Sequence, residues 1–345
     1  MNSKMKIVAL AALTVASAGS AFAQAEVSMY GRANVSLEEQ KVGSKSESVL
    51  VDNQSRVGVR AKRDIAGGMS VGATLEAGIN FTNGAHNPSN LFAREATANI
   101  AGSFGQVKVG RMAASSAYFA TADYVSNHNH DTGTSADALY DGIAAGKLKN
   151  AVGYTSPKLG DLQLEAQYGL KNATGVDGTD ARPVNPMALA ANYTAGALAL
   201  GLGYERGQHP VLARNNPDTT EEASQVTLRA YYTMGPIGFG GYVQKSSGTN
   251  FDRNAYRLSA MYTLGQNEFH VNYGSAGNRG GVANTGADQF TLGYNYNLDK
   301  QTKVYALYTQ VNNKSGSAYD PGRLFASPTD GQDVSSYGVG VRYNF

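Results

Sequence analysis

The sequence predicts an all-β protein, a 16-stranded antiparallel transmembrane β-barrel with an inward-folded third long loop. Three observations support this fold class. Apolar and polar residues alternate along many short segments, long and short connections alternate along the chain, and the chain ends on an alternating segment with an aromatic last residue. Alternation gives a strand one apolar and one polar face, as a barrel in lipid requires.

The last nine residues carry the clearest alternation. Apolar or aromatic side chains stand at 337, 339, 341, 343 and 345, with small or polar residues between them. A free apolar edge strand is a liability in a water-soluble protein, whereas in a closed barrel the last strand pairs with the first. We therefore expect Tyr343 and Phe345 to lie in the strand that closes the barrel.

The same period of two recurs upstream. In 225–232, for example, apolar residues at even positions alternate with Gln, Thr, Arg and Tyr at odd positions. An even number of strands is usual for bacterial single-chain barrels. Sixteen segments are predicted as strands: 27–37, 55–64, 69–81, 92–102, 105–111, 149–155, 161–170, 187–194, 197–205, 223–234, 237–245, 254–264, 267–274, 287–298, 303–311 and 334–345.

The connections between these segments are alternately long and short. In an up-and-down barrel this places every tight turn at one rim and every long loop at the other, as in outer-membrane barrels. The segment 112–148 is unusually long and has no clear strand pattern. We expect it to fold into the lumen and narrow it. The predicted long loops are 38–54, 82–91, 112–148, 171–186, 206–222, 246–253, 275–286 and 312–333.

The first 23 residues have the features of a secretory signal. Lys4 and Lys6 precede an apolar run over 7–18, and Ala21-Phe22-Ala23 fits a small-x-small cleavage site. The apolar run is shorter than the ~20 residues of a spanning helix. The predicted organisation is a cleaved signal peptide, 1–23, and a single outer-membrane barrel domain, 24–345.

Composition excludes some classes of function. The chain has 29 basic residues, and the 27 outside the predicted signal equal the 27 acidic residues. A nucleic-acid partner recruited by net charge therefore has no support. The chain contains no cysteine, which excludes disulfides and thiol chemistry.

No motif supports catalysis or a metal site. The five histidines, His86, His128, His130, His209 and His270, have no nearby serine in a nucleophile motif. Two of them stand in Asn127-His128-Asn129-His130-Asp131, but such spacing in a loop is a weak metal signal. We expect no enzyme activity, no catalytic residue, no cofactor and no metal. A barrel enzyme and a secreted soluble adhesin remain alternatives that the sequence alone leaves open.

Several segments in order resemble one family. They are Val27–Gly31, Ser55–Gly68, Leu91–Ala96, Gly102–Arg111, Asn150–Pro157 and Val341–Phe345. In sequence and spacing, the chain resembles the trimeric general porins of Gram-negative outer membranes, in the form typical of β- and γ-proteobacteria. The resemblance implies a homotrimer with one water-filled pore per subunit for passive diffusion of small hydrophilic solutes and ions. A solute-specific channel of the same fold is the second reading.

The resemblance also implies a pore constriction with a basic wall facing the third long loop. We expect the lipid bilayer, lipopolysaccharide and small solutes as partners, with the loop 82–91 between subunits. The residues carried over by position are Arg32, Arg56, Arg60, Arg94 and Arg111 for the basic wall, and Asp123, Asp131, Asp137 and Asp141 for the loop. Arg111 shares the face of Val107 and Val109 unless the strand bulges at Gly110. The sequence leaves the choice between anions and cations open.

Overall fold

The computed structural model describes residues 25–85, 90–126, 135–144, 148–171, 184–208, 222–248 and 251–345. The predicted signal peptide, 1–23, lies outside these ranges. None of the helices in the described residues is long and apolar enough to cross a membrane. The strand segments are β1 (Glu26–Val42), β2 (Lys45–Asp52), β3 (Arg56–Ile65), β4 (Met69–Gly78), β5 (Glu95–Gly102), β6 (Gly105–Arg111), β7 (Ala151–Thr155), β8 (Leu162–Gly169), β9 (Met187–Ala195), β10 (Leu198–Gln208), β11 (Glu222–Met234), β12 (Ile237–Gly248), β13 (Arg253–Leu264), β14 (Asn267–Ala276), β15 (Ala287–Asn297), β16 (Thr302–Asn313) and β17 (Val334–Asn344).

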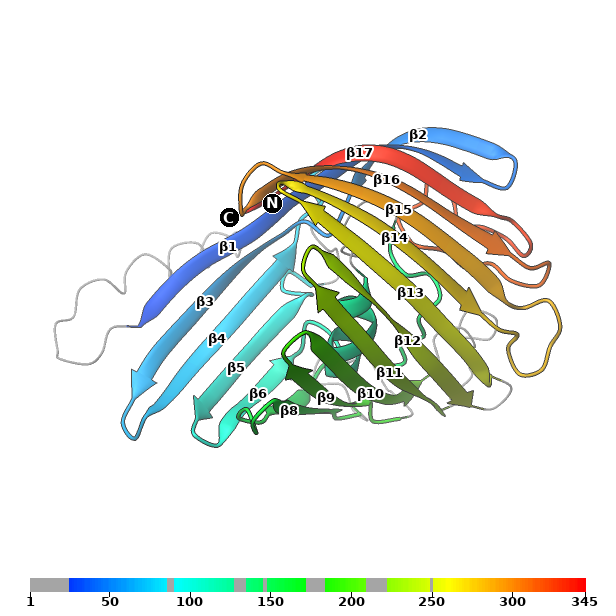
Figure 1. Cartoon of the computed structure of the whole chain (residues 1–345). Helices are drawn as coiled ribbons and strands as arrows, with labels where there is room; N and C mark the ends of the chain where they lie inside the picture. The colour runs from blue at the N-terminus through cyan, green and yellow to red at the C-terminus, as the bar shows by residue number, and fades with distance from the viewer. Residues whose placement is uncertain are drawn as a thin grey trace, which may run out of the picture.

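These segments form one closed antiparallel sheet (Figure 1). From β3 onward each strand pairs with the next along the chain, and β17 returns to pair with β1. Tyr343 stands opposite Ala33 in that last pairing. Phe345, one residue beyond β17, exchanges two backbone hydrogen bonds with Gly31, at 2.8 and 3.1 Å. The ring therefore has no open edge.

The 17 segments occupy 16 positions around the barrel. The first half of β1 pairs with β3, with Arg32 opposite Arg56, and the second half pairs with β2, with Val35 opposite Asp52. Because β2 and β3 run end to end beside the same strand, they count as one position. The predicted 16-stranded barrel is confirmed.

The prediction of a long loop over 38–54 is wrong. β1 continues to Val42, the chain turns at Gly43, where φ is +58°, and β2 pairs back along β1. Toward the tip of this hairpin, beyond Leu37, the outward positions of β1 carry Glu39 and Lys41, so the apolar alternation stops there. Hydrophobic alternation marks only the part of a strand that meets lipid. Where two paired strands extend beyond the membrane, the sequence shows no such alternation. Figure 1 shows β2 at the rim of the barrel.

The two faces of the wall differ in the way the sequence predicts. On β11, Val226 and Leu228 are 47% and 53% exposed, whereas Gln225 and Thr227 between them are 1% and 0% exposed. This is the reverse of a water-soluble protein, which buries its apolar side chains. The exposed apolar face meets hydrocarbon, and the polar face lines the interior.

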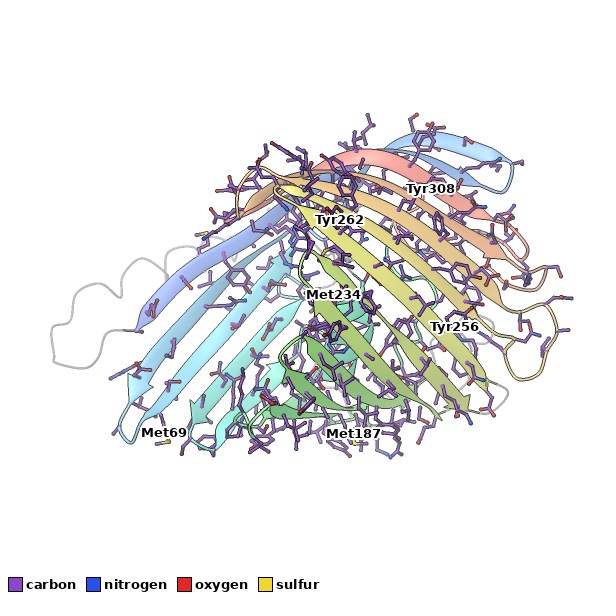
Figure 2. All side chains as sticks on the ribbon, in the orientation of Figure 1. Met69, Met187, Met234, Tyr256, Tyr262 and Tyr308 are labelled. Atoms are coloured by element: carbon purple, nitrogen blue, oxygen red, sulfur yellow. The ribbon has the colours of Figure 1, made fainter. Side chains whose placement is uncertain are left out.

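Aromatic side chains form two belts on the outer face. Near the tight turns, Phe269 packs against Tyr262 and Tyr294, with ring centroids 6.4 and 5.3 Å apart. Nearer the long loops, Tyr256 packs against Tyr273 at 6.3 Å. Figure 2 labels Tyr256 and Tyr262 toward opposite ends of β13. Such belts mark the two membrane–water interfaces of an outer-membrane barrel.

The third long connection lies against the inner wall. It contains α1 (Ser116–Tyr118) and η2 (Phe119–Asp123), which contact β8 to β11. Figure 1 shows these coiled ribbons within the ring of strands. A Cβ on Gly203 of β10 would stand 2.9 Å from Ala117, and one on Gly201 would stand 2.2 Å from the carbonyl oxygen of Ala120. Glycine at these inward positions therefore admits the backbone of the connection.

Candidate pore constriction

Four of the predicted basic residues lie on neighbouring elements, and two of them contact the same carboxylate. We call Arg32 of β1, Arg56 and Arg60 of β3, and Arg94 before β5 the arginine cluster. The carboxylate is Glu76 of β4. Its Oε1 lies 2.6 Å from the Nε of Arg94, and its Oε2 lies 4.0 Å from the Nε of Arg56. Arg94 and Arg56 therefore share one buried carboxylate, and Arg32 and Arg60 belong to the adjacent strands β1 and β3.

Tyr30 and Asn344 order the other two members of the arginine cluster. The Tyr30 hydroxyl donates to Oε2 of Glu76 at 2.9 Å, and the guanidinium carbon of Arg60 lies 3.9 Å above the Tyr30 ring. The Nε of Arg32 donates to Oδ1 of Asn344 at 3.0 Å. Arg60 is the exposed member, and the side chains of Arg56 and Arg94 are partly exposed.

The break between β2 and β3 helps to place Arg94. Gln54 lies in this break with φ +62°, a left-handed conformation that few non-glycine residues adopt. Its Oε1 accepts a hydrogen bond from Nη1 of Arg94 at 2.6 Å. The backbone N–H of Arg94 donates to the Glu76 carbonyl at 3.3 Å, so β4, β5 and the break together fix this side chain.

Arg111 lies beside the arginine cluster but in a different row. The inward row of β6 passes through Lys108 and Gly110 and continues to the buried Met112. Gly110 has φ +124°, which marks the irregular strand end. The Nε of Arg111 donates to the carbonyl oxygen of Ala93. The structure thus puts Arg111 at the root of the third long connection.

Two of the predicted loop carboxylates form buried ion pairs with the wall that supports them. Asp137 Oδ1 lies 3.1 Å from Nη1 of Arg257, and Asp141 Oδ2 lies 2.5 Å from Nη2 of Arg253. Both arginines belong to β13, and all four side chains are buried. We call these two pairs the loop anchor. Asp137 and Asp141 therefore hold the loop to its own wall, away from the arginine cluster.

Wall side chains also bind the loop backbone. The N–H groups of Ala138, Asp141 and Ala144 donate to the side chains of Gln289, Gln244 and Glu205, at 2.9, 2.9 and 3.0 Å. Buried backbone groups need such partners. The bonds distribute the attachment of 135–144 over β10, β12 and β15.

The remaining loop candidates are less defined. Asp123 ends η2 and is partly buried. Asp131 lies outside the described residues, as do His86, His128, His130 and His209. His270 lies on the inner face of β14, where its Nε2 is 3.0 Å from Nδ2 of Asn295 and 3.6 Å from Oε2 of Glu268.

Aromatic rings, rather than carboxylates, dominate the described open surface of the loop. Phe119 and Tyr124 are 47% and 45% exposed. Behind them, Tyr118 lies 5.9 Å from Phe119 and 5.4 Å from Tyr140, which in turn lies 5.9 Å from Tyr242 of the wall. We call Tyr118, Phe119, Tyr124 and Tyr140 the aromatic slab.

Arg229 of β11 is a site residue that no motif indicated. Its guanidinium carbon lies 3.7 Å from the centre of the Tyr124 ring, and its Nη2 donates to the carbonyl of Leu200 at 2.5 Å. It is 1% exposed, and no carboxylate of the described residues forms an ion pair with it. Strand parity could have found it, because Arg229 shares the inward row of Gln225 and Thr227.

Comparisons with known proteins agree with this architecture. The sequence model of a family described as Gram-negative porin matches residues 9–316. The chain is 26% identical to outer membrane porin protein 32 of Delftia acidovorans, over 99% of this chain and 100% of that one. It is 25% identical to outer membrane protein U of Vibrio parahaemolyticus, over 97% of this chain and 99% of that one.

Solved structures share the fold. An anion-selective porin from Comamonas acidovorans superposes with a TM-score of 0.76 at 22% identity, covering 93% of this chain and 100% of that one. The trimer form of OmpT from Vibrio cholerae superposes with a TM-score of 0.67 at 17% identity, covering 93% of this chain and 99% of that one.

Proposed function

Because this chain belongs to the Gram-negative porin family, we propose that the channel it forms favours anions over cations. The protein is an outer-membrane porin, a water-filled channel for the passive diffusion of small hydrophilic solutes and ions. A porin selects by the width of its constriction and by the charges that line it. Ion preference is therefore decided by the few charges that remain uncompensated in the lumen.

The observation that carries the proposal is an imbalance of charge. The arginine cluster holds four cations, two of which, Arg94 and Arg56, share the carboxylate of Glu76. The carboxylates of Asp137 and Asp141, which could have balanced it from the loop, already pair with Arg257 and Arg253. The Comamonas acidovorans structure, described as an anion-selective porin, agrees with this reading.

The expected preference is moderate. A unit charge about 6 Å from a permeating ion contributes roughly 0.7 kcal/mol at the dielectric constant of water, or about a threefold change in ion population. Several such charges act together, and salt screens them. We expect a preference that is clear in dilute salt and weaker in concentrated salt.

The test is the reversal potential of the purified porin in a planar bilayer under a potassium chloride gradient. A potential whose sign shows faster chloride movement supports the proposal. A potential of zero, or one of the opposite sign, contradicts it. Saturable block of the current by one nutrient class would instead indicate a solute-specific channel of the same fold.

We further propose a homotrimer in contact with lipid and lipopolysaccharide, produced after removal of residues 1–23. The trimer form recorded for OmpT of Vibrio cholerae supports the oligomeric state. We propose no enzymatic role, because the relatives are named as porins or outer membrane proteins. Gel mobility before and after heating tests the trimer, and sequencing of the mature amino terminus, expected at Gln24, tests cleavage.

A further inference from the structure

We propose that the constriction discriminates among organic anions and favours aromatic carboxylates, such as benzoate, over saturated carboxylates of the same size and charge. The inference rests on the proposed anion preference, which brings carboxylates into the lumen. It adds a second contact, made by the aromatic slab, that charge alone does not provide.

The aromatic slab and the arginine cluster lie on different sides of the lumen. The positions are counted around the ring of 16, starting at β1. The strand β3 is at position two. The strands β9 and β10, which both α1 and η2 contact, are at positions eight and nine. The two groups are therefore six to seven positions apart, close to the eight that separate opposite walls. The contact between Arg111 and Ala93 places the root of the loop beside the arginine cluster.

The aromatic slab is a supported surface rather than a set of loose side chains. Tyr118, Tyr140 and Tyr242 form a chain of ring contacts from Phe119 to the wall, with centroids between 5.4 and 5.9 Å apart. Tyr140 also accepts a hydrogen bond from Gln225 at 2.7 Å. Rings held in this way bind a planar partner with little loss of side-chain entropy.

Arg229 changes the electrostatic potential at the exposed ring of Tyr124. Its guanidinium occupies one side of Tyr124, and Tyr231 packs against the same ring edge-on at 5.7 Å. A buried cation beneath a ring reduces the negative potential of its faces. An aromatic carboxylate carries a net negative charge, so it stacks more favourably on Tyr124, which has a cation behind it, than on an isolated phenol.

The arginine cluster is suited to the other end of the same solute. Arg60 is exposed, and its guanidinium carbon already lies 3.9 Å from the centre of the Tyr30 ring. Guanidinium groups bind carboxylates through paired N–H donors and stack on aromatic faces. A solute with both a carboxylate and a ring can therefore contact the arginine cluster and the aromatic slab in turn as it crosses the lumen, whereas a saturated carboxylate uses only the charge.

The experiment compares benzoate with cyclohexanecarboxylate in planar bilayers that contain the purified porin. The permeability of each anion relative to chloride is taken from reversal potentials, and their ratio cancels any change in overall conductance. We expect a ratio of about fivefold in favour of benzoate, as one aromatic contact of about 1 kcal/mol gives. The variants Phe119→Leu and Tyr124→Leu should each lower the ratio, and Tyr124→Phe should retain it.

Tyr193→Leu is the matched control, because Tyr193 is an exposed tyrosine on the outer face of β9. It should leave the ratio unchanged. Equal permeability of benzoate and cyclohexanecarboxylate in the parent protein overturns the inference, and so does a ratio that survives in both leucine variants. Failure of the anion preference is a separate result, because it is read from potassium chloride without any organic solute.

Discussion

The arginine cluster and the loop anchor are built from the same chemical groups in different proportions. In the loop anchor, Asp137 and Asp141 each meet one arginine of β13, and all four side chains are buried. In the arginine cluster, Arg94 and Arg56 share the carboxylate of Glu76, and the four arginine side chains are partly or largely exposed. Equal numbers of opposite charges produce an attachment, whereas an excess of one sign produces a field in the lumen.

The difference teaches where selectivity can arise. A buried ion pair is held in place by the cost of separating its charges, and it presents little net charge to a passing ion. An exposed, uncompensated charge acts on the permeating ion directly. Breaking the loop anchor should therefore alter the shape of the pore, and changing the arginine cluster should alter its preference.

The largest effect is expected from Arg253→Met. This change leaves the Asp141 carboxylate buried without its cation and removes the bond from Arg253 to the carbonyl of Leu139. Loss of one partner of a buried pair costs about 3–5 kcal/mol, so the attachment of the segment 135–144 to the wall should weaken around Asp141. Single-channel recordings should show a noisy, altered conductance, and thermal unfolding should begin at a lower temperature.

The double variant Arg253→Met with Asp141→Leu is the control. It removes both charges and replaces them by apolar groups, which is often neutral for stability. We expect it to recover most of the thermal stability and a steady conductance. Equal current noise in the single and double variants would mean that the packing of the Arg253 side chain, rather than its charge, holds the loop.

The next largest effect is expected from Arg94→Ala. It removes one cation from the arginine cluster and leaves Glu76 with less compensation. The ratio of anion to cation permeability should fall by about threefold in dilute salt. The difference from the parent should shrink in about 1 M salt, where the Debye length is about 3 Å.

Arg111→Ala provides the comparison within the same region. Arg111 lies outside the inward row and donates to the carbonyl of Ala93. We expect it to reduce the anion preference less than Arg94→Ala does. Equal shifts in reversal potential for the two variants would place Arg111 in the lumen with the arginine cluster.

The sign of the field is tested by Glu76→Gln. The amide keeps one acceptor oxygen, which can serve Tyr30 or Arg94 but not both, and it removes the carboxylate that Arg94 and Arg56 share. The anion preference should increase by up to about threefold. A decrease would show that Glu76 matters mainly by positioning the arginines, which the reversal potential of the variant would reveal.

The barrel itself was predictable because lipid imposes a strict rule on the sequence. Every strand must show lipid one apolar face, so alternation located the strands, and the order of connections gave their topology. The same rule explains the failure over 38–54. There, Glu39 and Lys41 occupy outward positions beyond the hydrocarbon, and the pattern that identifies a strand is absent although its backbone ladder continues.

The partners of the charged residues were not predictable. Strand parity places Arg229, Arg253 and Arg257 in the lumen. The path of the loop decides their partners: Arg253 pairs with Asp141 and Arg257 with Asp137. Arg229 lies beneath Tyr124. The loop has no periodicity, so its path depends on long-range contacts. The aromatic slab was missed for the same reason, since Tyr118 and Phe119 carry no local signal of exposure.

The smallest effect is expected at Asp299, a carboxylate outside both regions that gives the baseline for an exposed group. It lies in the tight turn between β15 and β16, and its Oδ1 accepts the backbone N–H groups of Gln301 and Thr302, both at 2.7 Å. These hydrogen bonds favour the charged form and hold the pKa of Asp299 below its ordinary value. Because the folded pKa lies below the unfolded one, the stabilisation is present at neutral pH and is lost as pH falls through the folded pKa.

Asp299→Asn keeps an acceptor but cannot titrate, so its thermal unfolding temperature should fall slightly less in acid than that of the parent. Identical pH profiles for the two proteins in detergent micelles would show that this turn contributes nothing to acid sensitivity, which would then arise from carboxylates elsewhere in the barrel.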